Sequence, residues 1–232
     1  MVDVEYRGRF GNRLFQYAFA RLQAERHLVP YCMTLDGGGI LESDDSAMSR
    51  NPPDHFERVQ EDLGGPWRPP VLTPDRHVLF GGYFQRWDFF RDCREHVREF
   101  FRLPRVPRLP EDCVGIHLRL ADYRQIPGMV KDPSAYFGVL DRLRAREIVV
   151  VTDDPSDPYL QAFRDRYENL QVASGSARSD FELLMSMSTL VVGNSTFSWW
   201  AAYLGGPSRV FVPRDFGPGS ASSGLHNLGI AF

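Results

Sequence analysis

The sequence predicts an α/β protein whose C-terminal half is a doubly wound parallel sheet. From residue 113 onward, short apolar runs alternate with segments of helical periodicity. These runs are apolar at every position, which is typical of parallel strands that helices cover on both faces. A proline-rich stretch, LPRVPRLPED at 103–112, precedes this half. Because each proline removes an amide donor and disfavours a helix before it, we expect an extended linker there.

The first half is expected to be less regular. Its opening helix carries apolar residues at helical spacing from Leu14 to Leu22, which indicates packing against a core. Residues 36–76 are rich in Gly, Pro and Asp and are predicted to be mainly loop. The expected elements are a strand over 1–6, a helix over 12–26, a short helix near 55–63, a strand over 78–84 and a helix over 85–101.

Strands and helices alternate in the second half. The capping box formed by Ser179 and Glu182 predicts the start of one helix. The arginines around the linker, Arg98, Arg102, Arg105 and Arg108, are expected to form a solvated face. The expected strands cover 113–119, 147–152, 169–173, 189–194 and 209–213, and the expected helices cover 134–146, 158–167, 179–188 and 195–205.

Composition and charge restrict the classes of function. The chain has 232 residues and a formal net charge of −3, so no basic excess indicates nucleic-acid binding. No apolar run reaches the roughly 18 residues of a membrane span, and no signal-peptide pattern precedes the first strand. Cys32, Cys93 and Cys113 form neither a zinc pattern nor a disulfide framework. We therefore expect a cytoplasmic protein, with peripheral attachment to the inner membrane left open.

Polar side chains follow the carboxyl ends of several predicted strands, where parallel α/β sheets bind ligands. His117 and Arg119 end one strand, and Asp153 and Asp154 follow the next. Ser195 begins a helix, whose unpaired amides and partial positive charge suit a phosphate. Arginine can fork two hydrogen bonds onto phosphate oxygens, and a carboxylate can accept from the two adjacent donors of guanine. Together these residues predict a site for a nucleotide diphosphate.

Each of these residues also has a purely structural interpretation, which stays open. A strand-end arginine can be a salt-bridge partner, Asp-Asp-Pro can start a helix, and Ser-Thr can cap one. Other chemistries have weaker support. The sequence contains no Walker loop, no dinucleotide fingerprint, no G-x-S-x-G elbow, no metal-ligand spacing among its six histidines and no D-x-D pair. The sequence therefore predicts no metal site.

Ordered motifs resemble the signature of the bacterial and animal α-1,2-fucosyltransferases. The segments run from residue 8 to about residue 205, which is most of the chain. The early GRFGN and the later HLR are also similar to the protein O-fucosyltransferases. The segments are GRFGNRLFQYAFARLQAE, GGYFQRWDFF, IHLRLADY, VVTDDP and MSMSTLVVGNSTFSWWAAYL.

The resemblance implies a GT-B-like fold of two Rossmann-like halves that face each other across a cleft. Residues 1–108 are then the acceptor-side half, and residues 109–232 hold the nucleotide sugar. The implied reaction is an inverting, metal-independent transfer of L-fucose from GDP-fucose to a glycan hydroxyl, which forms an α-fucoside without a cofactor. The implied setting is bacterial biosynthesis of a surface polysaccharide or another glycan. The acceptor, the linkage position and the oligomeric state are not predicted.

The resemblance also assigns roles to single residues. Arg119 grips the diphosphate and stabilises charge on the departing GDP, while Asp122 is a candidate general base by its motif position. Hydrogen-bond donors that are already in position around a leaving group can replace a metal ion in stabilising its charge. The residues implied to bind the nucleotide sugar are Arg9, Asn12, His117, Arg119, Asp153, Asp154, Ser195, Thr196 and Phe197.

One motif departs from the pattern of many relatives. They carry H-x-R-R-G-D-Y, whereas Leu120 and Ala121 replace the second arginine and the glycine here. This departure leaves two alternatives open. The chain could be a transferase that uses another nucleotide sugar, or a non-catalytic protein that binds a nucleotide sugar.

Overall fold

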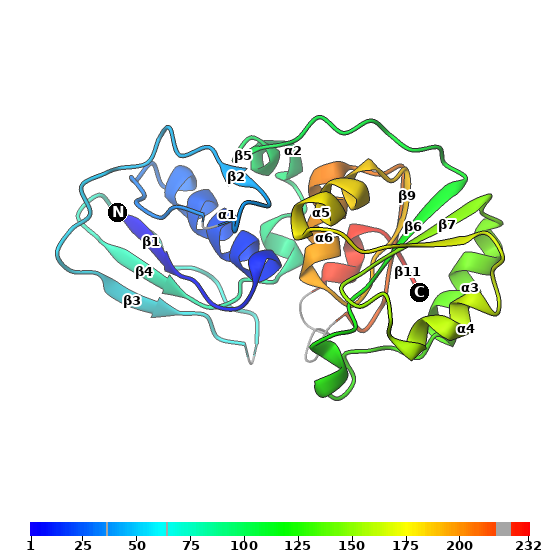
Figure 1. The fold of residues 1–232 in the computed structure, drawn as a ribbon. Helices are drawn as coiled ribbons and strands as arrows, with labels where there is room; N and C mark the ends of the chain where they lie inside the picture. The colour runs from blue at the N-terminus through cyan, green and yellow to red at the C-terminus, as the bar shows by residue number, and fades with distance from the viewer. Residues whose placement is uncertain (36, 64, 217–223) are drawn as a thin grey trace. The chain divides into compact units, whose positions relative to one another are not determined.

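The chain divides into two compact units in the computed structural model, which describes residues 1–35, 37–63, 65–216 and 224–232. The first unit is Met1–Leu103, and the second is Pro104–Phe232. Both units combine helices with parallel strands (Figure 1). The predicted α/β class is therefore confirmed.

A three-stranded parallel sheet of order β1–β4–β3 forms the centre of the first unit. Helix α1 follows β1 and packs on the sheet, where the ring of Phe19 lies 5.3 Å from that of Phe80. A separate antiparallel pair joins β2 to β5. The elements of this unit are β1 (Val2–Glu5), α1 (Phe10–Arg26), β2 (Glu42–Ser43), β3 (Glu57–Gln60), β4 (Val78–Gly81), η1 (Trp87–Phe89), α2 (Arg94–Arg98) and β5 (Phe101–Arg102).

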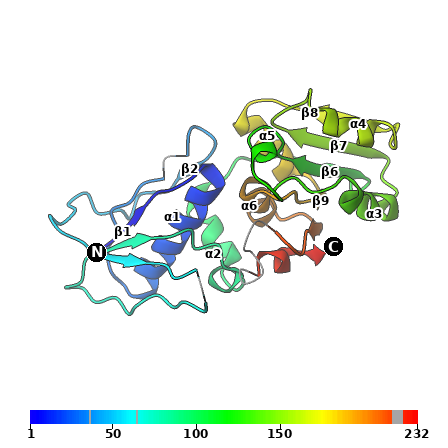
Figure 2. The same cartoon turned by 90° about the horizontal axis from the view of Figure 1, so that it is seen from below.

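The second unit is built on a six-stranded, all-parallel sheet of order β11–β10–β9–β6–β7–β8. Helices α3 and α4 cover one face and α5 and α6 the other, as Figures 1 and 2 show. The strands are β6 (Cys113–Leu118), β7 (Glu147–Thr152), β8 (Leu170–Ala173), β9 (Thr189–Val191), β10 (Arg209–Val212) and β11 (Ile230–Ala231). The helices are η2 (Tyr123–Gln125), α3 (Ser134–Leu143), η3 (Pro158–Leu160), α4 (Gln161–Arg164), α5 (Ala177–Ser186), α6 (Thr196–Gly205) and η5 (Leu225–Leu228).

This architecture confirms the predicted doubly wound sheet. Every residue of β6 is buried, as the uniformly apolar run required. Complete burial of a valine, isoleucine or leucine side chain contributes about 1.5–3 kcal/mol, so the central strands fix the position of the residues at their ends. The core on the α3 and α4 face joins Ile116 and Val150 to Leu140 and Phe163.

Two helix predictions in the first half were wrong. The segment expected as a helix near 55–63 contains β3, an edge strand whose mostly exposed side chains give no strand-like alternation. The single helix expected over 85–101 is broken into η1, α2 and β5. Here buried Glu61 accepts hydrogen bonds from the Phe84 amide at 2.7 Å and from Arg86 Nε at 3.0 Å. These long-range bonds hold the start of the segment out of helical geometry.

The predicted capping box was also wrong. Helix α5 begins two residues earlier than expected, with Ser176 as its cap. The Ser176 hydroxyl accepts a hydrogen bond from the Ser179 amide at 3.1 Å. Ser179 therefore lies in the first turn of the helix, and Glu182 instead accepts from Arg178 one turn away at 3.0 Å. Ser176 and Ser179 are both residues of a type that caps helices, and Ser176 is the one that caps α5.

Candidate functional site

The strand order of the second unit places a topological switch point at the carboxyl end of β6. The chain passes from β6 through β7 to β8 on one side and then returns to β9 on the other side of β6. Such a reversal leaves the connections after β6 and β9 diverging, and ligands of open α/β sheets bind at this point. His117 and Arg119 lie at the end of β6, and Gly193 to Ser195 follow β9. The topology thus joins the polar residues that were predicted from strand ends.

Arg119 is the central cation of this edge. Its side chain is 13% exposed and forms a two-pronged pair with Asp122, with Nε to Oδ1 and Nη2 to Oδ2 both at 2.8 Å. The guanidinium also lies 4.5 Å from the ring centroid of Tyr123 and 4.0 Å from a carboxylate oxygen of Asp153. Burial lowers the pKa of Arg119. The hydrogen bonds with Asp122 and the nearby negative charges together raise it by more than burial lowers it, so the net shift is upward. A preformed guanidinium fork therefore stands at the switch point.

Asp153 shapes the loop that carries Arg119. Its Oδ1 accepts hydrogen bonds from the amides of Leu120 at 2.7 Å and Ala121 at 3.2 Å. Leu120 itself is 1% exposed and belongs to the apolar core of the unit. The loop is thus held from both sides, by a carboxylate at its backbone and by an apolar side chain in the core. Leu120 is therefore a core residue of the unit.

Asp154 is engaged differently from its neighbour. Its Oδ1 accepts from the amide of Ser156 at 3.0 Å and from the hydroxyl of the same serine at 2.7 Å. The structural interpretation of Asp-Asp-Pro therefore applies to Asp154, which closes a turn. Asp153, by contrast, lies with Arg119 and Asp122 in one cluster.

His117 is a buried, neutral histidine beside this cluster. It is 5% exposed, and its ring lies 5.4 Å from that of Phe197 at the start of α6. Burial lowers its pKa to about 4, with smaller opposing effects of Asp153 and Arg119. Its Nδ1 is buried and has no hydrogen-bond partner among the described residues. An unpaired buried nitrogen costs about 1–3 kcal/mol, which a polar ligand at this edge could recover.

The start of α6 lies at the same edge. Ser195 is 1% exposed, caps the helix and accepts from the Phe197 amide at 3.3 Å. The preceding Asn194 donates to the Met129 carbonyl at 3.0 Å and so fixes the connection. At Gly193 an added Cβ would lie 1.9 Å from the His117 carbonyl oxygen, so only glycine permits this approach of the two strand ends. Thr196 follows in the first turn and is partly exposed.

The predicted residues of the first unit form a local cluster of their own. Gly8 has a φ of +75°, and an added Cβ would lie 2.3 Å from Nδ2 of Asn12. Asn12 Oδ1 accepts a hydrogen bond from Gln85 Nε2 at 2.9 Å. Arg9 is exposed and precedes α1, whose first turn contains no acidic residue. The turn is thus built around a left-handed glycine, and an anion here meets the positive end of a long helix.

Sequence reasoning did not identify two residues that support these clusters. Gln85 joins the GGYFQ segment to the opening turn, and Tyr123 lies beneath Arg119. Both belong to motifs that carry the family resemblance, which was the available signal. The contact between Gln85 and Asn12 joins segments that only the fold brings together. The contact between Tyr123 and Arg119 depends on the side-chain rotamer of Arg119.

No group of three or more His, Cys, Asp or Glu side chains in the described part of the chain is placed to hold a metal ion. None of the helices described is both long and apolar enough to cross a bilayer.

Comparison with known proteins decides the family. The family model of glycosyl transferase family 11 matches residues 75–215, which is more than half of the chain. The chain belongs to glycosyl transferase family 11. It is therefore a glycosyltransferase, and the resemblance to α-1,2-fucosyltransferases seen in the sequence is confirmed.

Individual relatives of this family 11 protein span most of its length. The galactoside 2-alpha-L-fucosyltransferase Sec1 of Mus musculus is 28% identical over 261 residues, covering 95% of this chain and 68% of the mouse protein. The SEC1 enzyme of Bos taurus is also 28% identical, over 252 residues, with coverage of 94% and 68%. Among solved structures, the NodZ alpha-1,6-fucosyltransferase soaked with GDP-fucose matches with 17% identity and a TM-score of 0.47, covering 90% of this chain and 92% of that one.

Proposed function

We propose that this family 11 protein transfers L-fucose from GDP-fucose to a hydroxyl of a galactoside, with inversion at the anomeric carbon. Family membership and the names of the relatives support this donor and this acceptor class. The observation that carries the proposal is the Arg119 fork beside the N-terminus of α6 at the switch point of the sheet. These two groups form a site for a diphosphate, and the donor contains one.

Binding of the diphosphate exchanges the partner of Arg119. In the structure described here the guanidinium fork is filled by Asp122. A phosphate offers the same geometry of two acceptor oxygens, and charge-assisted bonds of this kind contribute about 1.5–3 kcal/mol each. The phosphate therefore replaces Asp122 at little net cost. The start of α6, with Ser195, Thr196 and Phe197, supplies further donors to the same group.

The exchange at Arg119 also assigns a role to Asp122. Once phosphate holds Arg119, the Asp122 carboxylate is released and can accept the proton of the attacking hydroxyl. The acceptor oxygen then forms a bond to C1 of fucose while the bond from C1 to the phosphate oxygen breaks. The proton passes to Asp122, and GDP leaves with the additional negative charge. Arg119 and the helix N-terminus stabilise that charge, so the reaction needs no divalent cation.

The remaining predicted residues complete the donor site. Of the two aspartates predicted near the base, Asp153 is the candidate to accept hydrogen bonds from guanine, whereas Asp154 holds the turn at Ser156. His117 is the neutral group next to the nucleotide. Arg9 and Asn12, at the start of α1, are the anion-binding candidates of the first unit. We place this chemistry in the cytoplasm, which the three free cysteines support.

The substitution Arg119→Ala tests the proposal. Since the extra charge on GDP arises only in the transition state, kcat with GDP-fucose and lactose should fall by about 10²–10³, as for a lost oxyanion donor. GDP affinity measured by calorimetry should fall much less, by about tenfold. Arg142→Ala removes an exposed arginine on α3 and is the matched control, with both values unchanged. Equal losses of kcat and GDP affinity would favour a non-catalytic binding protein.

A second candidate donor follows from Leu120. This residue is buried in the core at a position where many relatives carry arginine, so the donor site has one cation fewer. The alternative is a transferase that uses another nucleotide sugar. A thermal-shift panel of GDP-fucose, GDP-mannose and UDP-sugars separates the two, because the true donor raises Tm most at equal concentration.

A further inference from the structure

A surface pocket in the first unit is lined by none of the residues assigned to the donor site. It has a volume of about 590 Å³ and is lined by residues of this unit between Leu35 and Arg102. Ligand pockets commonly measure about 300–1,000 Å³, so this one has room for a small saccharide. We name it the glycine-loop pocket, after Gly37, Gly38 and Gly39, which form part of its wall.

The glycine loop leaves backbone exposed to a ligand. Gly38 and Gly39 have φ values of +55° and +74°, which side chains rarely adopt. An added Cβ at either glycine would meet no atom within 4 Å, so the space beside the backbone is open. Gly37, in contrast, packs so tightly that its Cβ would lie 2.0 Å from the Leu41 carbonyl oxygen. One glycine anchors the loop, and the next two present main-chain groups at close range.

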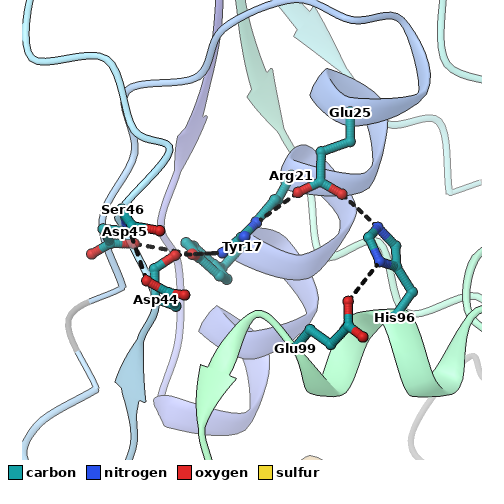
Figure 3. A network of polar contacts seen from close by, with 8 residues as sticks. All are labelled: Tyr17, Arg21, Glu25, Asp44, Asp45, Ser46, His96 and Glu99. Carbon is teal, nitrogen blue, oxygen red and sulfur yellow. Dashed lines mark hydrogen bonds and ion pairs between the residues drawn. The ribbon is translucent and has the colours of Figure 1, made fainter.

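Asp45, which also lines the pocket, belongs to a polar network that includes the buried side chains of Tyr17 and Arg21 (Figure 3). Asp45 accepts from the Tyr17 hydroxyl at 3.0 Å and from the Ser43 hydroxyl at 2.9 Å. Behind them, Arg21 donates to Tyr17 at 3.0 Å and to the Asp44 carbonyl at 2.7 Å.

Arg21 gives this network its rigidity. It is only 7% exposed, its guanidinium lies 4.2 Å from the ring centroid of Phe100, and it is paired with Glu25 at 3.0 Å. His96 of α2 contacts the other oxygen of Glu25 at 2.5 Å. Because a buried cation and its partners fix the loop, the acceptor groups of Asp45 are preorganised at the pocket wall.

The charges around the pocket select the chemistry of the ligand. Its lining includes two carboxylates, Glu42 and Asp45, and two guanidinium groups, Arg50 and Arg102. Glu42 and Arg102 already form a pair at 3.7 Å. An anion meets the carboxylates and a cation meets the arginines, so neither gains from this balanced lining. A neutral, hydroxyl-rich molecule can donate to the carboxylates and accept from the arginines at the same time.

We infer that the glycine-loop pocket binds an uncharged sugar ring of the acceptor glycan. This inference rests on the proposed transfer to a galactoside and adds the place where that acceptor is recognised. Hydroxyl pairs of the ring bridge the carboxylate and guanidinium groups, and the backbone of Gly38 and Gly39 lies against it. Ser46, which also lines the pocket, stands next to Asp45.

Two variants test the inference with matched controls. Ser46→Phe fills the pocket, while Ala47→Phe adds the same ring at the neighbouring exposed residue outside the lining. Glu42→Gln removes one lining carboxylate, while Glu57→Gln removes an exposed carboxylate paired with Arg76 elsewhere on the unit. Saturation-transfer NMR with lactose and with methyl β-D-galactoside reports binding without requiring turnover. Steady-state kinetics with lactose and GDP-fucose report KM for each substrate, and Tm reports folding.

The expected result is loss of saturation transfer to both saccharides in Ser46→Phe. In Glu42→Gln, we expect KM for lactose to rise about tenfold, as for one lost charge-assisted hydrogen bond. Both controls, the KM for GDP-fucose and Tm stay unchanged. Unaltered lactose binding in folded Ser46→Phe overturns the inference, as does no detectable saturation transfer to the wild-type protein. Loss of GDP affinity instead of lactose binding also overturns it. If lactose binds at this pocket without any transfer, the inference stands and the proposed function fails.

Discussion

His117 is a titratable residue that the fold removes almost completely from water. It lies at the carboxyl end of the central strand, is 5% exposed and contacts Phe197. Its pKa of about 4 means that the folded protein holds the ring neutral throughout the physiological range. In the proposed donor site, His117 is thus an uncharged hydrogen-bonding group, and Arg119 carries the positive charge.

The lowered pKa of His117 predicts a pH dependence of stability. The unfolded chain takes up a proton near pH 6.5, whereas the folded chain does so only near pH 4. The contribution of neutral His117 to the free energy of unfolding is therefore fully present above pH 6.5. It is lost as the pH falls from 6.5 to 4, and the total loss is about 3 kcal/mol.

Urea unfolding at pH 7.5, 6 and 4.5 measures this effect. The fall in unfolding free energy on acidification should be smaller by about 2–3 kcal/mol in His117→Gln than in the wild type. His55→Gln, at an exposed histidine of the first unit, should behave as the wild type. Identical pH profiles for wild type and His117→Gln would contradict the burial described here.

The candidate site residues could be selected from the sequence, but their contacts could not. The rule that ligands bind beyond strand ends was enough to select His117, Arg119, Asp153 and Ser195 before the fold was known. The partners of these residues could not be predicted in the same way. The bonds from Asp153 to the loop at Leu120 join positions 33 residues apart, and sequence spacing carries no information on such a contact.

At the scale of elements, one arginine joins the ends of two helices to the linker. Arg108 donates to the carbonyls of Met185 at 2.8 Å, Met187 at 3.0 Å and Gly206 at 2.9 Å, and also to Gly205. The last carbonyls of a helix have no partner inside it and carry partial negative charge. The prediction that this arginine belongs to a solvated face is confirmed by its exposure, and its guanidinium also serves the C-terminal ends of α5 and α6.

Removal of this contact should destabilise the second unit. We expect Arg108→Ala to lower the unfolding free energy by about 1–2 kcal/mol, since the helix-end carbonyls are left to water. Arg105→Ala, also exposed on the linker, is the control and should change it by less than about 0.5 kcal/mol. Urea unfolding measures both. Hydrogen exchange of the last turn of α6 should become faster only in the Arg108 variant, and equal stability of the two variants would exclude this role.

Elements with strong local patterns were predicted well, and those set by tertiary contacts were not. The strand predicted over 147–152 is β7 with the same bounds, because a long apolar run in a buried parallel strand has few alternatives. Besides the two-residue strands β2 and β5, the strands that were missed are β3 and β11. The first is an exposed edge strand, and the second is a two-residue pairing of Ile230 and Ala231 with β10, too short for any periodicity.

In the whole molecule, the two units are proposed to have different roles. The second unit carries the fork of Arg119 and the N-terminus of α6, which suit the diphosphate of the donor. The first unit carries the opening turn at Gly8 and the glycine-loop pocket with its balanced charges. Donor and acceptor are thus proposed to be recognised mainly by separate units of one family 11 chain.

The structure of the reaction product tests most directly whether this protein transfers fucose from GDP-fucose to a galactoside with inversion. The wild-type protein is incubated with GDP-fucose and lactose without added metal, and the products are analysed by NMR. We expect fucose attached in the α configuration to a hydroxyl of the galactose residue, with one GDP released for each bond formed. A β-linked fucoside would contradict inversion, and GDP binding without transfer to any neutral galactoside would contradict the proposed enzyme itself.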